Sequence, residues 1–351
     1  MVWAAIALVT LFTITVFLNR AYHRTRLSRA EGSYRTGERL AGAGRNAEAA
    51  EDFRAALLYE HDDPRYRFAL AQSLVALKRW SEAENYLLDL RTSDPTSGPV
   101  NLMLARIAAN EGLTDGAIDN YHRAIFGYWP DKPEENRVEA RMELIGLLDR
   151  MGQSKAALAE TLALADEIPD SDTATRERAA QMLLAHGSPQ HAAEVYRALV
   201  AAHPHDAGAR QGLGESLYEM GDIAGALASY HAAVRYGSIT PALAARIALL
   251  NSILDLDPTL LRLTYRQRFE RARELLSRTA ASAARCAATP AGLMNEAQTE
   301  LAQTARRQRE GDTAQMLTLA QTLWRARTAA CPGQPEPDQP LAVLMTRMPN
   351  Q

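Results

Sequence analysis

The sequence contains few of the residues from which catalytic and metal sites are built. Only two of its 351 residues are cysteines, Cys286 and Cys331, and they form no Cys-x-x-Cys pair. This spacing gives no support to a thiolate metal cluster or a dithiol redox motif. No Ser/His/Asp or Cys/His arrangement for nucleophilic catalysis stands out. We therefore predict that the chain is not an enzyme and binds no cofactor and no metal.

The chain also lacks an excess of positive charge. Its 39 lysines and arginines are balanced by 42 acidic residues, which gives a net charge of −3. Nucleic-acid-binding domains normally carry a basic surface, so we predict no nucleic-acid partner. The sequence is 47% hydrophobic, which is ample for a large helical core.

What the sequence does contain is a repeated helical pattern. In the stretch "KRWSEAENYLLDLRTSDP", Trp80, Ala83, Leu87 and Leu90 lie three or four residues apart, and Pro95 ends the run. This spacing predicts one apolar face of a helix that is too short to be stable alone. The small residue of this face, Ala83, has equivalents along the chain, and successive members of the series are 34, 34, 40, 35 and 34 residues apart. The recurring residues are Ala49, Ala83, Ala117, Ala157, Ala192 and Ala226.

A glycine stands five residues before the small residue in every unit except the second, where the position is Lys78. A period of about 34 residues with this layout resembles the tetratricopeptide repeat family. The resemblance covers residues 30–240 as about six tandem units, and it implies an all-α solenoid of helical hairpins with a concave face. The longer spacing predicts an enlarged turn over residues 127–137. The glycines are Gly44, Gly112, Gly152, Gly187 and Gly221.

The first residues form a separate element. Residues 2–18 carry no charge, and as a helix they would extend about 25 Å, the short limit for a membrane span. A cleaved secretion signal is the alternative, but no Lys or Arg precedes the run and no small-x-small cleavage site follows it. We therefore predict a transmembrane helix over residues 1–19, in contact with the lipid bilayer through residues 2–18, and a basic linker over 20–29. The arginines of that linker favour a cytoplasmic location for the folded part, with a periplasmic location as the alternative.

Beyond residue 240 the repeat pattern fades. Residues 241–258 predict a helix that caps the last repeat, and residues 259–331 predict a helical bundle. The first helix of that bundle is basic and amphipathic, so it could bind a membrane or a partner, or pack with a solvated charged face. Residues 332–351 are rich in proline and predict an extended tail. The bundle helices are expected near 259–286, 292–310 and 312–330.

The two cysteines are expected at the same end of this bundle if its helices run antiparallel. A disulfide between Cys286 and Cys331 would require an oxidising compartment, against the cytoplasmic location. We therefore predict two separate thiols, and the disulfide is the alternative.

The family resemblance implies a function in protein–protein interaction. We predict a non-enzymatic, membrane-tethered scaffold, similar to membrane-anchored bacterial repeat proteins of envelope assembly. The alternative is a regulatory subunit or an enzyme that acts through the C-terminal helices. The resemblance places the partner groove on the first helix of each unit, and Arg106 with Asn110, one helical turn apart, is the polar pair we expect to contact a partner. The expected groove residues are Phe68, Gln72, Leu102, Arg106, Asn110, Met142, Asp149, Arg150, Gln181, Gln211, Glu215 and Tyr218.

Overall fold

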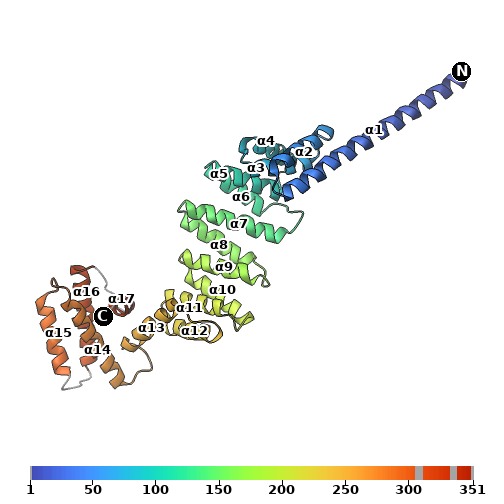
Figure 1. Cartoon of the computed structure of the whole chain (residues 1–351). Helices are drawn as coiled ribbons and strands as arrows, with labels where there is room; N and C mark the ends of the chain where they lie inside the picture. The colour runs from blue at the N-terminus through green and yellow to red at the C-terminus, as the bar shows by residue number, and fades with distance from the viewer. Residues whose placement is uncertain (1, 305–310, 333–337, 349–351) are drawn as a thin grey trace. The chain divides into compact units, whose positions relative to one another are not determined.

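The chain is all-helical. The computed structural model describes residues 2–304, 311–332 and 338–348, and for residues 2–10 only the backbone. Within these ranges it has 17 helices and no β-strand, which agrees with the predicted all-α fold (Figure 1). The chain divides into two compact units, Met1–Pro169 and Asp170–Gln351, which we call unit 1 and unit 2.

Unit 1 consists of four helical hairpins. In each hairpin the second helix packs against the first helix of the same hairpin, and in the first three hairpins it also packs against the first helix of the next one. The helices are α1 (Val2–Gly42), α2 (Asn46–Tyr59), α3 (Pro64–Ala76), α4 (Trp80–Ser93), α5 (Gly98–Asn110), α6 (Thr114–Ile125), α7 (Pro133–Arg150) and α8 (Ser154–Glu167).

Unit 2 begins with two further hairpins and ends in a helical bundle. The two parts share one apolar core, which runs from the last hairpin through α13 into the bundle. The hairpin helices are α9 (Thr173–Ala185), α10 (Pro189–Ala202), α11 (Ala207–Glu219) and α12 (Ile223–Tyr236). The remaining helices are α13 (Pro241–Leu256), α14 (Tyr265–Ala284), α15 (Ala291–Thr304), α16 (Asp312–Ala330) and α17 (Gln339–Arg347).

The helices of a hairpin approach closely because the contact residues are small. All six recurring alanines are completely buried. In two hairpins a glycine of the first helix receives an aromatic ring of the second. A Cβ on Gly37 would lie 2.6 Å from the Phe53 ring, and a Cβ on Gly214 would lie 2.6 Å from the Tyr230 ring. Any larger side chain at these glycines would force the helices apart.

The turns inside the hairpins have the geometry that the glycines predict. Gly112 has φ +75°, and the N–H of Leu113 donates to the carbonyl of Ala108 at 2.9 Å, which closes the end of the helix. Lys78, the exception in the sequence, adopts the same left-handed conformation with φ 59°. For a residue with a side chain this conformation costs roughly 1–2 kcal/mol.

The predicted enlarged turn between the third and fourth hairpins is held firmly in place. The N–H of Tyr128 donates to the carbonyl of Thr96 at 2.8 Å, and the N–H of Gly98 donates to the carbonyl of Tyr128 at 2.9 Å. Trp129 is buried, and its Nε1 donates to the carbonyl of Ala124 at 2.8 Å. The extra residues therefore form part of the packing between two repeats.

The N-terminal segment differs from the sequence-based prediction. The predicted anchor, the linker and the first helix of the first repeat form one continuous helix, α1. Among the residues that the structure describes, no helix has a stretch long and apolar enough to cross a bilayer. The predicted transmembrane helix is therefore not supported by the structure. The side chains of residues 2–10, which make up half of the predicted span, lie outside the described part.

The predicted extended tail is wrong for part of its length. Helix α17 lies inside residues 332–351, and its Leu341, Ala342 and Leu344 are buried in the core of unit 2. Pro340 stands in the first turn of this helix, where its missing N–H breaks no hydrogen bond. The predicted helix near 292–310 is described as α15 up to Thr304, and its remaining residues lie outside the described part.

Candidate partner-binding surface

The first helices of neighbouring hairpins lie side by side in unit 1. Helix α1 contacts α3, and α3 contacts α5. Ion pairs from Arg106 on α5 to two glutamates on α7 extend the row. We call the surface formed by the solvent-accessible side chains of α3, α5, α7 and the end of α1 the first-helix face of unit 1.

Most of the predicted groove residues of unit 1 are accessible on this face. The side chains of Gln72, Asn110, Asp149 and Arg150 are exposed, and those of Phe68 and Met142 are half-buried. Leu102 is the exception, because only 6% of it is exposed. It supports the core beneath the face and cannot contact a partner without a rearrangement.

Arg106 connects the third hairpin to the fourth. Its Nη2 lies 2.6 Å from one oxygen of Glu143, and its Nε lies 3.0 Å from the other. The same Nη2 donates to Glu139 at 2.9 Å, and the Tyr121 hydroxyl donates to Glu143 at 3.1 Å. Burial and the carboxylate of Glu143 raise the pKa of Tyr121, so this hydroxyl keeps its proton at neutral pH. The Arg106 guanidinium, which we expected to contact a partner, thus forms a bidentate ion pair with Glu143 inside the chain.

Asn110 is also used internally. Its Nδ2 donates to the backbone carbonyl of Arg106 at 2.8 Å, one turn earlier in the same helix.

The sequence-based prediction missed an aromatic cluster at the N-terminal end of the same face. Tyr34 on α1 and Tyr66 on α3 pack with ring centroids 4.9 Å apart, and the guanidinium of Arg65 lies over both rings. Burial and a hydrogen bond with Glu38 raise the pKa of Tyr34 to about 12. The signal was present in the sequence, because Tyr34 occupies the position in the first unit that Phe68 occupies in the second.

In unit 2 the predicted groove residues divide into two pairs. Gln181 on α9 and Gln211 on α11 are exposed. Glu215 accepts hydrogen bonds from Tyr230 at 2.5 Å and from Arg246 at 3.0 Å. Glu215 also lines a pocket of about 500 Å³. Its lining residues are Leu184, Ala185, Gly187, Pro189, Glu215 and Glu219.

Tyr218 lies beneath two arginines from later helices. The guanidinium of Arg246, on α13, lies 4.6 Å from its ring centroid, and that of Arg347, on α17, lies 4.9 Å away. Arg347 also donates to the backbone carbonyl of Tyr218 at 2.9 Å. The cap and the C-terminal helix therefore cover the end of the last repeat.

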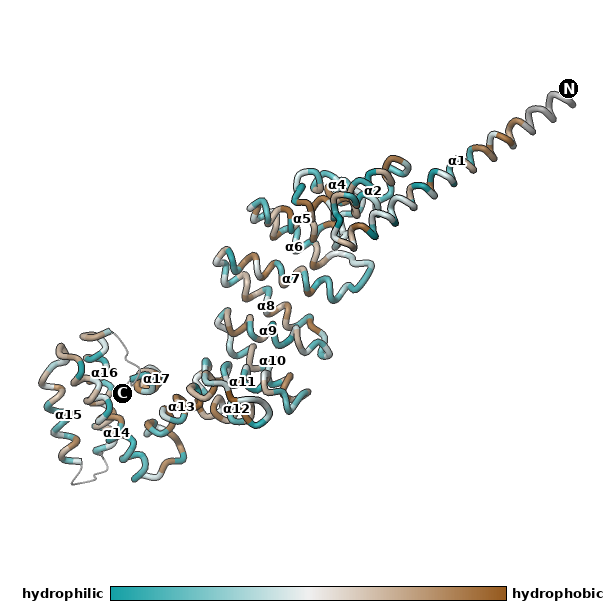
Figure 2. The backbone as a smooth tube through the Cα atoms, viewed as in Figure 1, coloured by the Kyte–Doolittle hydropathy of each residue, from teal (hydrophilic) through white to brown (hydrophobic). Residues whose placement is uncertain are grey.

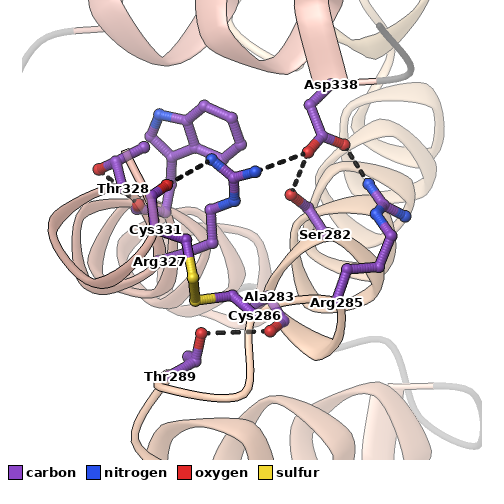
Figure 3. A network of polar contacts seen from close by, with 10 residues as sticks. Ser282, Ala283, Arg285, Cys286, Thr289, Arg327, Thr328, Cys331 and Asp338 are labelled. Carbon is purple, nitrogen blue, oxygen red and sulfur yellow. Dashed lines mark hydrogen bonds and ion pairs between the residues drawn. A yellow bond between two sulfur atoms is a disulfide. The ribbon is translucent and has the colours of Figure 1, made fainter. Parts of the chain in front are cut away.

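The two cysteines meet in the C-terminal bundle, so the prediction of two separate thiols is wrong. A disulfide joins Cys286, after α14, to Cys331, after α16, with their Cα atoms 6.1 Å apart (Figure 3). Beside it the buried carboxylate of Asp338 accepts hydrogen bonds from Ser282 at 2.6 Å and from Arg327 at 3.3 Å, and it also pairs with Arg285. Because Asp338 immediately precedes α17, these contacts hold the start of α17 against α14 and α16.

No metal centre is found in the described part of the chain. There, no three His, Cys, Asp or Glu side chains are arranged so that they could hold an ion.

Comparison with known proteins supports the repeat assignment. The tetratricopeptide repeat family model matches residues 40–107 and 183–237. No curated protein matches the chain. The predicted tetratricopeptide repeats are thus confirmed for these two segments, one in each unit.

Several solved structures are similar to the chain at low identity. YrrB, described as a tetratricopeptide repeat protein with an unusual peptide-binding site, is 17% identical over 57% of this chain and 98% of its own, with a TM-score of 0.41. A tetratricopeptide repeat protein from Parabacteroides merdae is 15% identical over 84% of this chain and 99% of its own, with a TM-score of 0.38. The type IV pilus biogenesis factor PilW is 12% identical over 62% and 97%, with a TM-score of 0.39.

The ion pair of Arg106 leads to a prediction about stability. Replacement Arg106→Gln should lower the free energy of unfolding by about 1 kcal/mol, because it removes a two-pronged ion pair between adjacent repeats. Glu143→Gln should cost a similar amount, and the double variant should cost much less than the sum. Urea unfolding followed by circular dichroism measures all three.

Asn110→Ala is the matched control, because the side chain of Asn110 is exposed and, among the described residues, its hydrogen bond stays within its own helix. It should change the free energy of unfolding by less than about 0.5 kcal/mol. Strictly additive losses from Arg106 and Glu143 would contradict the coupling between the two repeats.

Proposed function

We propose that this chain is a non-enzymatic scaffold that holds a segment of a partner protein on the first-helix face of unit 1. The observation that carries the proposal is the contrast between the buried and the exposed side chains of this face. Arg106 and Leu102 are used to hold the repeats together, whereas Gln72 and Arg150 point to solvent beside the half-buried Phe68 and Met142. The array thus presents side chains that its own packing does not require.

The chemistry of the face indicates what kind of segment it would hold. The side chains of Phe68 and Met142 offer apolar contact, and Met adapts its shape to different partners. The amide of Gln72 can both donate and accept hydrogen bonds, as the backbone of an extended peptide does. Acidic and basic groups are both present, so a partner segment with a strong charge of one sign is not favoured. We propose an extended or helical segment with an apolar side.

We also propose that the N-terminal part of α1 tethers the scaffold to a bilayer, where it would serve envelope assembly. Leu11, Phe12 and Phe17 support this proposal, because they are 64%, 69% and 71% exposed. Large apolar side chains exposed along one helix are unfavourable in water and are typical of a segment that contacts lipid or another protein.

For the folded part we propose a location outside the cytoplasm, in an oxidising compartment such as the periplasm. This is the alternative that the sequence left open. The bond between Cys286 and Cys331 supports it, since disulfides persist in such compartments and are rare in the cytoplasm.

The scaffold proposal is tested by changing charge on the first-helix face alone. The double variant Gln72→Arg with Arg150→Glu should weaken capture of partners from a membrane lysate by about tenfold, or about 1.4 kcal/mol of binding free energy. Both side chains are exposed, so the melting temperature should change by only a few degrees. Quantitative mass spectrometry of the captured proteins gives the measurement.

The control places the same charge changes on the second helices of unit 1. Asn85 on α4 and Arg123 on α6 are exposed, so Asn85→Arg with Arg123→Glu is a matched pair. An equal loss of capture with this pair, or a loss with this pair alone, would show that the first-helix face is not the binding surface.

The proposed compartment is tested by maleimide labelling of protein that is denatured directly from cells. If the folded part lies in an oxidising compartment, Cys286 and Cys331 should react only after reduction. Labelling of both thiols without reduction would place the folded part in the cytoplasm.

A further inference from the structure

The loop between α13 and α14 presents leucine side chains to solvent. Leu261 is 97% exposed, and Leu260 and Leu263 on either side are half-buried. Tyr265, at the start of α14, is 45% exposed. In Figure 2 the connection between the two helices includes a hydrophobic stretch. Such an exposed group of apolar side chains is costly in water.

Arginines surround these leucines. Arg262, Arg266 and Arg268 are all exposed. Arg266 pairs with Glu270 at 2.8 Å, whereas Arg262 and Arg268 make no side-chain hydrogen bond or ion pair with any residue that the structure describes. The nearest acidic residue before the loop, Asp257, accepts hydrogen bonds from the N–H and the hydroxyl of Thr259. The site therefore combines apolar side chains with two arginines, Arg262 and Arg268, that have no partner among the residues the structure describes.

The backbone of the loop is fixed at both ends. At its start, Arg271 donates to the carbonyls of Leu254 and Asp257. At its end, Thr264 and Gln267 form a reciprocal capping box at the start of α14. The turn that exposes Leu261 is thus well defined. The loop would lose little conformational freedom if Leu261 moved from water into an apolar environment.

Helix α14 itself cannot supply the apolar contact. The sequence left open whether this basic amphipathic helix binds a membrane or packs in the bundle. The structure shows that Phe269, Ala272 and Leu276 are buried in the core of unit 2. The exposed apolar side chains lie together with the arginines in the loop and the first turn of the helix.

We propose that residues 260–268, which comprise the loop and the first turn of α14, form a membrane-contact site that inserts Leu261 into the interface of a bilayer containing anionic lipid. The interface of a bilayer has an apolar layer of acyl chains and a polar layer of headgroups. The leucine can contact the acyl chains, and the guanidiniums around it can donate hydrogen bonds to the lipid phosphates. One or two leucines give only weak binding, so the contact depends on negative lipid charge. The proposal does not rest on the partner surface of unit 1 or on the N-terminal segment.

The test places an environment-sensitive fluorophore at the loop of the full chain. Leu261→Cys is labelled with a nitrobenzoxadiazole dye under non-reducing conditions, which keeps Cys286 and Cys331 joined. With vesicles that contain phosphatidylglycerol, the emission should shift to the blue, and a quencher attached to the acyl chains should reduce it at least about twofold. Pure phosphatidylcholine vesicles should give a much smaller response. Replacing Arg262 and Arg268 by Glu should abolish the response to phosphatidylglycerol.

Leu58→Cys is the matched control, because Leu58 is also a highly exposed leucine, at 80%, but lies on α2 in unit 1. Its label should remain in water with both kinds of vesicle, even if the N-terminal segment brings the chain to them. An equal response at both positions, no response at position 261, or an equal response to both lipids would overturn the proposal. Shielding of position 261 by a lipid-free protein extract, without a response to vesicles, would identify the loop as a protein-docking site instead.

Discussion

The close approach of two helices at a small residue is the contact on which the rest of this structure depends. An alanine on the second helix of every hairpin is completely buried, and in two hairpins a glycine of the first helix lies directly against an aromatic ring. This contact determines how the first helices of successive hairpins line up in unit 1. The packing uses the sides of α3, α5 and α7 that face the second helices. The solvent-accessible side of these three helices therefore remains available for a partner.

Periodic features could be predicted from the sequence because each unit repeats the same local rule. The glycines predicted where each first helix ends, and even the exception at Lys78 occupies the left-handed turn. The role of Arg106 could not be predicted in this way. Its partner Glu143 lies 37 residues further on, in the one interval where the period is longer, so their approach depends on how the enlarged turn packs. For the same reason, a face inferred from register alone included Leu102, which is buried.

The two ends of the chain show where composition misleads. Residues 332–351 contain enough proline to predict an extended tail, yet Pro340 stands at a helix start and the residues after it bury three apolar side chains. Burial of the Asp338 carboxylate among Ser282, Arg285 and Arg327 was not predictable, because it joins positions up to 56 residues apart. The disulfide beside it joins the C-terminal ends of α14 and α16 in the same corner of the bundle. At the other end, a hydropathy argument treated residues 1–19 as a separate element, whereas the structure continues residues 2–19 into the first repeat.

The central claim is that a partner binds on the first-helix face of unit 1, and site-specific photo-crosslinking tests it most directly. A photo-reactive amino acid is placed at Gln72 on α3 in one variant and at Asn85 on α4 in another, both exposed side chains of the same hairpin. After irradiation in cells, the account predicts a discrete crosslinked protein from position 72 and none from position 85. Crosslinks from position 85 alone, or from both positions to the same protein with equal yield, would contradict it.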